Sequence, residues 1–157
     1  MDFVVGNMWT NLLGTKLKNM LRLGGYINIL IAIGHIVGLI WAKQMFEVTG
    51  IGKEMNELAQ TNSLLPYLLT IFVSIVFVIF GLYGLSADGK FRKLPFLKLG
   101  IFAIGGIYIF RGLGELVFDM SKQEASPFVE TTYSLIALAI GLLFLIGGLK
   151  KWKLKKE

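Results

Sequence analysis

Four long apolar stretches occupy more than half of the 157-residue sequence, at residues 23–42, 64–87, 99–118 and 131–149. Each is close to the ~20 residues that an α-helix needs to cross ~30 Å of hydrocarbon at ~1.5 Å rise per residue. The hydrocarbon core of a bilayer contains no water to hydrogen-bond with backbone N–H and C=O groups. Such stretches therefore form helices, in which these groups bond to one another. The sequence therefore predicts an all-α membrane protein with four transmembrane helices in an antiparallel bundle, spanning residues 23–149.

The segment before the first stretch has a different character. Within residues 1–22, apolar side chains such as Val5, Met8, Trp9 and Leu12 recur at helical spacing opposite polar ones. This pattern predicts an amphipathic helix lying in the membrane interface. The helix serves either as a plain anchor or as a site for anionic lipid, and the sequence leaves both open.

Basic residues indicate the orientation. Most of the 16 lysines and arginines fall in residues 1–22, in the connection at 88–98 and in the basic tail at 150–157. The positive-inside rule assigns these three segments to the cytoplasm. We therefore expect a multi-pass protein with both termini cytoplasmic and membrane lipids as partners. The formal net charge of +6 accompanies no groove-reading motif, so nucleic-acid binding is not predicted.

Several kinds of chemistry are excluded by composition. The sequence contains no cysteine and one histidine, which rules out disulfides, thiolate metal sites and bis-histidine haem within one chain. It also contains no phosphate-binding glycine loop, zinc-protease motif or nucleophile elbow. We therefore predict no cofactor, no metal site and no assigned catalytic residue.

The connections between the stretches carry turn and helix signals. Asp88-Gly89 predicts a turn in a short cytoplasmic hairpin. Residues 43–63 form the longest connection, on the outer side, and Ile51, Met55 and Leu58 share one face of a short predicted helix. That helix is either a lid over the outer end of the bundle or a surface helix in the interface.

Small residues in all four stretches predict close helix packing. They are Gly34 and Gly38, Gly81 and Gly84, Gly105 and Gly106, and the face formed by Ser134, Ala137, Gly141 and Gly148. Such faces serve either folding within one chain or association between copies.

Ionisable residues inside the apolar stretches are the most informative feature for function. His35 and Arg111 each lie about 12 residues from the cytoplasmic start of a stretch, or about 18 Å deep, so we expect them to be level. Glu115 follows Arg111 by four residues and Tyr108 precedes it by three, which places all three on one helix face. Ser74 and Ser134 are expected in the same outer half.

Two interpretations of this cluster remain. In the first, the cluster is a polar ligand-binding pocket in the outer half of the bundle, with Arg111 holding an anionic or carbonyl-bearing ligand and His35 exchanging a proton. In the second, the Arg111–Glu115 pair only fixes the helix register. Intramembrane ionisable groups mark functional sites by default, so we favour the first. The candidate ligand-binding residues are His35, Arg111, Glu115, Tyr108, Ser74 and Ser134.

A family resemblance covers residues 83–113. The run Tyr83-Gly84-Leu85-Ser86-Ala87-Asp88-Gly89, then Arg92-Lys93-Leu94-Pro95, then Ile107-Tyr108-Ile109-Phe110-Arg111-Gly112-Leu113 resembles a block of small four-helix bacterial membrane proteins, similar in size and topology to DoxX-like proteins. The resemblance implies that Tyr108, Arg111 and the Leu94-Pro95 hairpin belong to a recurring pattern, and it implies a bacterial plasma membrane. It implies no substrate.

Three function classes follow. The first is a non-enzymatic membrane protein, either an assembly subunit or a binder of a small amphiphile through the polar cluster. The second is a channel or transporter built from several copies, although residues 64–87 and 131–149 contain no charged residue. The third is a membrane enzyme acting on a lipid or quinone-like substrate, with His35 as general base and Arg111 as electrostatic stabiliser. We favour the first, and a second copy or another membrane protein remains open as a partner.

Overall fold

The computed structural model describes residues 2–89, 91–119 and 127–153. In these ranges the elements are α1 (Asp2–Gly38), the 3-10 turn η1 (Leu39–Trp41), α2 (Ala42–Val48), α3 (Gly52–Thr61), α4 (Leu65–Asp88), α5 (Leu97–Asp119) and α6 (Pro127–Lys153). The described residues contain no β-strand. Four segments are long and apolar enough to cross a membrane, namely Asn19–Val48, Leu65–Ala87, Leu97–Val117 and Thr131–Trp152. These confirm the all-helical fold and the four long apolar helices predicted from the sequence.

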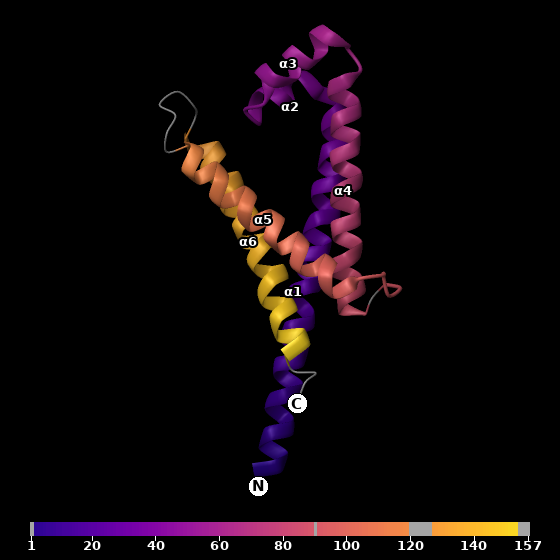
Figure 1. The fold of residues 1–157 in the computed structure, drawn as a ribbon, viewed down its shortest axis with the longest axis vertical. Coiled ribbons are helices and arrows are strands. Elements are labelled where there is room, and N and C mark those ends of the chain that lie inside the picture. The colour runs from indigo at the N-terminus through magenta and orange to yellow at the C-terminus, as the bar shows by residue number, and fades with distance from the viewer. Residues whose placement is uncertain (1, 90, 120–126, 154–157) are drawn as a thin grey trace.

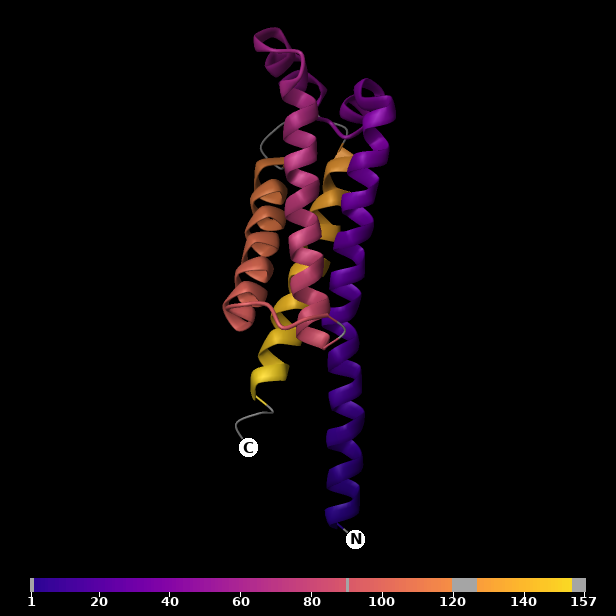
Figure 2. The same ribbon diagram turned by 90° about the vertical axis from the view of Figure 1, so that its right-hand side faces the viewer.

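The four long helices form two antiparallel pairs, α1 with α4 and α5 with α6 (Figures 1 and 2). We call the end with the α4–α5 loop and the last turn of α6 the inner end, and the end with α2 and α3 the outer end. The two pairs meet toward the inner end and diverge toward the outer end (Figure 1). The architecture is therefore a pair of helical hairpins that open outward.

Glycines allow α1 and α4 to pack closely. A Cβ atom at Gly84 would lie 2.8 Å from the Cα of Gly25 and from the carbonyl oxygen of Leu21, and one at Gly81 would lie 2.9 Å from the carbonyl oxygen of Gly25. The Ser74 hydroxyl adds a hydrogen bond of 3.0 Å to the carbonyl oxygen of Ala32. The backbones of α1 and α4 are thus in direct van der Waals contact.

The second pair uses the same device. A Cβ at Gly112 would meet the carbonyl oxygen of Ser134 at 2.9 Å, and one at Gly141 would meet Ile109. Ser134, Ala137, Gly141 and Gly148 are all buried, as the predicted small-residue face of the last span requires. This face packs against α5.

A compact apolar core holds the two pairs together near the inner end. Phe144 of α6 is 0% exposed and packs against Gly24 of α1, while Ile101 of α5 is also 0% exposed. Leu21 of α1 is 1% exposed and contacts the position of Gly147 on α6. Moving such a side chain from water into a protein core stabilises the fold by roughly 1.5–3 kcal/mol. Between helices surrounded by lipid this hydrophobic contribution is small, and van der Waals packing stabilises the contact instead.

Two expectations differ from the structure. Residues 2–38 form one unbroken helix, so the segment expected to lie separately in the interface continues directly into the first span. A Cβ added at Gly34 or Gly106, both expected at helix contacts, would meet no atom within 4 Å, and one at Gly38 would meet only Met45. Glycine spacing marks a smooth helix face without identifying which face a neighbour covers.

Turns close the connections as expected. Gly89 adopts a left-handed conformation with φ 86°, which ends α4 at the predicted Asp88-Gly89 turn. At the outer end, Gly50 with φ 80° joins α2 to α3, and the Thr49 hydroxyl donates to the carbonyl oxygen of Met45 at 2.7 Å. The short helix predicted within 43–63 is present as α3 and is joined there by α2.

Candidate ligand site between the helix pairs

One buried side-chain hydrogen bond links the two helix pairs and fixes their register. The Tyr108 hydroxyl of α5 donates to Oδ1 of Asn28 on α1 at 2.6 Å. Asn28 is 0% exposed, and its amide nitrogen donates to the carbonyl oxygen of Gly24 at 2.8 Å. Both groups of this amide therefore have partners, as a buried polar side chain requires.

An ion pair lies further along the same face of α5. Nη2 of Arg111 is 2.9 Å from Oε1 of Glu115, an i, i+4 spacing that brings the two side chains together on one helix face. The Arg111 side chain is 56% exposed and that of Glu115 is 39% exposed. The pair is thus formed along α5, with both side chains substantially exposed.

Helical geometry shows which way Arg111 points. Arg111 follows Gly100 by 11 residues, close to three full turns, so both project in nearly the same direction from α5. Gly100 packs against the ring of Tyr83 on α4. Arg111 therefore turns toward the α1–α4 pair, from which α5 diverges toward the outer end (Figure 1).

His35 lies on the α1 face that turns toward α5. It follows Asn28 by seven residues, nearly two turns, so it shares the direction of the amide that Tyr108 reaches. Nδ1 of His35 is 2.8 Å from the carbonyl oxygen of Ile31. A carbonyl can only accept, so Nδ1 carries the hydrogen and Nε2 is left to accept a hydrogen bond or take a proton.

The Asn28–Tyr108 bond is a common reference point for the site residues on α1 and α5. Both α1 and α5 run outward from this bond (Figure 1), and His35 and Glu115 each lie seven residues beyond it. Counted along its own helix, His35 therefore lies as far from this bond as Glu115 does, and Arg111 lies about one turn, or about 6 Å, closer to the bond. Because α5 tilts away from α1 (Figure 1), distances along the helices are not depths, and the predicted equal depth of His35 and Arg111 stays a prediction.

The serines have different roles in the structure. Ser134 of α6 is 0% exposed, and its hydroxyl is 3.4 Å from Oε2 of Glu115, so it belongs to the cluster. Ser74 bonds to Ala32 inside the α1–α4 contact and is 4% exposed. The structure thus gathers Tyr108, Arg111, Glu115 and Ser134 around α5, and it uses Ser74 to join α1 and α4.

Aromatic rings connect His35 to Tyr108. The ring centroid of Phe77 on α4 lies 5.1 Å from that of His35 and 6.5 Å from that of Tyr108, and Phe80 lies 6.0 Å from Tyr108. These phenylalanines were not among the predicted site residues, because phenylalanine within an apolar span carries no distinguishing signal. They make an apolar wall beside the polar groups.

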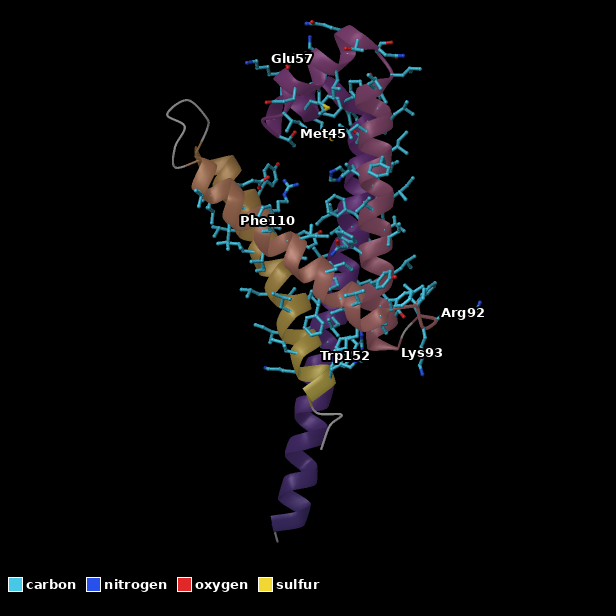
Figure 3. All side chains as sticks on the ribbon, viewed as in Figure 1. Met45, Glu57, Arg92, Lys93, Phe110 and Trp152 are labelled. Carbon is cyan, nitrogen blue, oxygen red and sulfur yellow. The ribbon has the colours of Figure 1, made fainter. Side chains whose placement is uncertain are left out.

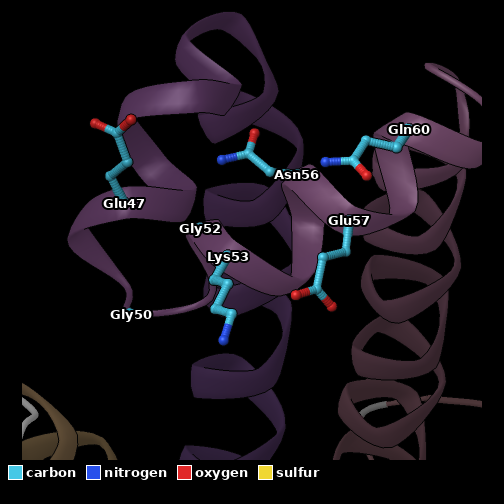
Figure 4. Close-up of a pocket in the computed structure, with 7 residues that line it drawn as sticks. All are labelled: Glu47, Gly50, Gly52, Lys53, Asn56, Glu57 and Gln60. Atoms are coloured by element: carbon cyan, nitrogen blue, oxygen red, sulfur yellow. The ribbon is translucent and has the colours of Figure 1, made fainter.

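Two hollows lie at the outer end, apart from this cluster. One of about 600 Å³ lies between α2 and α3, and it is lined by Glu47, Gly50, Gly52, Lys53, Asn56, Glu57 and Gln60 (Figure 4). The other, of about 270 Å³, is lined in part by Phe46, Met55 and Tyr67. Neither includes a predicted site residue.

On α5 and α6 the cluster combines a cation, an anion and a hydroxyl, and on the α1–α4 pair His35 lies beside the aromatic ring of Phe77. Such a site suits a polar head group attached to an apolar chain. The residues described contain no group of three or more metal-ligating side chains.

No protein-family model, curated protein or solved structure matches this chain. The resemblance to DoxX-like proteins therefore stays a prediction.

Proposed function

We propose that this protein is a non-enzymatic membrane protein that binds a small amphiphile between its two helix pairs, with the head group at Arg111, Glu115 and His35. The supporting observation is the Arg111–Glu115 pair, which lies on the side of α5 that turns toward α1 and α4 and is partly exposed. An arginine at this depth costs about 2.5–3.5 kcal/mol to insert on biological scales. A pair needed only for packing gains most from being closed off, whereas a binding pair must leave its ligand a way in.

The chemistry of the cluster favours a head group that accepts hydrogen bonds. One carboxylate occupies only part of the guanidinium, because Arg111 carries five N–H donors and the 2.9 Å contact uses Nη2. His35 adds a ring nitrogen, Nε2, that changes between acceptor and donor on protonation. A carboxylate, phosphate or carbonyl group fits these donors, and the chain of the amphiphile would lie along Phe77 and Phe80.

The membrane setting belongs to the same proposal. The basic residues of the α4–α5 loop and of residues 150–157 support a cytoplasmic inner end, with both termini inside and the ligand site in the outer half. The bacterial plasma membrane is the proposed location.

A head-group series tests the proposal. Purified protein in a non-ionic detergent is exposed to dodecanoate, dodecanol or dodecyltrimethylammonium, which share one chain length, and the adducts are counted by native mass spectrometry. We expect one bound dodecanoate per chain. We expect no bound dodecyltrimethylammonium, because its positive head group is repelled by Arg111. Arg111→Gln should remove the dodecanoate adduct.

The matched control is Lys43→Gln, which removes the same charge from an exposed position at the start of α2. It should retain dodecanoate. Binding of all three amphiphiles alike, or the same dodecanoate binding by Arg111→Gln, would refute the assignment. The double variant Arg111→Leu/Glu115→Leu should fold and lose binding, whereas its failure to fold would favour a role in helix register alone.

A further inference from the structure

The α4–α5 loop at the inner end carries exposed aromatic and basic side chains side by side. We define the inner-loop patch as Phe91, Arg92, Lys93, Phe96 and Lys98. Phe91 is 44% exposed and Phe96 is 81% exposed, and the three basic residues are also exposed. Figure 3 shows Arg92 and Lys93 extending from the loop away from the helices. Residues 89–98 contain no acidic side chain.

Side chains of α4 hold this loop in place. The Ser86 hydroxyl donates to the carbonyl oxygen of Arg92 at 2.8 Å and accepts from the backbone nitrogen of Leu94 at 3.0 Å. The Tyr83 hydroxyl donates to the carbonyl oxygen of Pro95 at 3.2 Å. The loop is thus tied to the end of the preceding span at three successive points, which sets where its side chains project.

The backbone of Phe96 is a second, independent indication that the loop is held in one conformation. It has φ 48° and is the one non-glycine residue with positive φ among the residues described. A bulky residue in the left-handed region is strained, and such strain persists only where the surrounding structure imposes it. In this strained conformation the ring of Phe96 is exposed, directly before α5 begins at Leu97.

We infer that the inner-loop patch binds the head group of an anionic phospholipid, with Phe91 and Phe96 in the acyl-chain border and Arg92, Lys93 and Lys98 on the phosphate. Two features identify this occupant. The loop joins the ends of two spans, so it lies at the depth where head groups meet acyl chains, and aromatic side chains favour that border. Each basic residue near an anionic surface favours binding by about 1 kcal/mol, which is about five-fold.

A local fluorescent reporter tests the inference. Trp9, Trp41 and Trp152 are replaced by Phe, and Phe91→Trp is introduced, so that one tryptophan reports from the loop. The protein is reconstituted in phosphatidylcholine vesicles, and brominated phosphatidylglycerol or brominated phosphatidylcholine is added at equal fractions as a contact quencher. We expect at least five-fold preferential quenching by phosphatidylglycerol, reduced by 0.5 M NaCl.

Variants separate a built site from diffuse charge. Arg92→Gln/Lys93→Gln should bring the preference close to one, whereas Lys43→Gln/Lys53→Gln, with the same charge loss at the outer end, should retain it. Ser86→Ala keeps every charge but frees the loop, and it should reduce the preference at least two-fold. Equal quenching by both lipids, or a preference that survives Arg92→Gln/Lys93→Gln, would overturn the inference. An unchanged preference in Ser86→Ala would refute the clamped geometry.

Discussion

The hydrogen bond between Tyr108 and Asn28 sets the register of α5 against α1, so Tyr108→Phe tests the fold at the point where it positions the site. The substitution removes one hydroxyl and leaves Oδ1 of Asn28, at 0% exposure, without its donor. An unsatisfied buried acceptor costs about 1–3 kcal/mol, and interhelical hydrogen bonds measured in membranes average about 0.6 kcal/mol with a maximum near 1.7. We therefore expect the free energy of unfolding to fall by about 1–2 kcal/mol.

The assay is reversible unfolding in mixed micelles with increasing dodecyl sulfate, followed by circular dichroism. Tyr83→Phe is the matched control, since the Tyr83 hydroxyl donates at 3.2 Å to Pro95 in an exposed setting, and we expect a loss below about 0.5 kcal/mol. Combining Tyr108→Phe with Asn28→Leu completes a double-mutant cycle, whose coupling energy should be about 1 kcal/mol. A coupling energy near zero would show that this bond does not hold the pairs together.

Three further predictions concern packing and the polar cluster. Gly84→Ala should cost about 1–3 kcal/mol in the same unfolding assay because its Cβ would lie 2.8 Å from Gly25 and Leu21, whereas Gly34→Ala, with open space around it, should be neutral or stabilising, and equal effects would contradict the packing. Ser74→Ala should lower the free energy of unfolding by about 0.5–1.5 kcal/mol yet leave dodecanoate binding unchanged, and lost binding would place Ser74 in the site. Glu115→Gln should keep the fold and tighten dodecanoate binding measured by native mass spectrometry, since removing the carboxylate frees Arg111, and weaker binding would refute that competition.

The four helices could be predicted from sequence because length and hydropathy alone decide whether a segment can cross a bilayer. Their pairing could not, since every span offers small residues and spacing does not reveal which faces meet. Gly25 packs against Gly81 and Gly84 of α4, whereas a Cβ at the predicted Gly34 would meet no neighbour. The divergence of the two pairs could not be predicted either, because it depends on which large side chains, notably the buried Phe144, pack between the pairs at the inner end.

The candidate site was predictable to a similar extent. An ionisable residue inside an apolar span is conspicuous, and i, i+3 and i, i+4 spacing correctly placed Tyr108, Arg111 and Glu115 on one face. The contribution of Asn28 to the register needed a contact 80 residues away in the chain. Ser74 looked like a site residue by depth, yet depth does not distinguish which neighbour its hydroxyl meets.

Arg111 and Phe110 are neighbours at the same depth, and the proposed site requires one to meet water and the other lipid. The chain contains no cysteine, so Arg111→Cys and Phe110→Cys each give a single thiol without background. In vesicles, a membrane-impermeant methanethiosulfonate reagent supplied on both sides reacts with thiolate, which forms only where water reaches. Phe110 is 82% exposed in the isolated chain, but it lies about 100° around α5 from Arg111 and away from α1 and α4. Arg111→Cys should react at least ten-fold faster than Phe110→Cys, and dodecanoate should slow that reaction. Equal rates, or faster reaction of Phe110→Cys, would contradict an opening between the helix pairs.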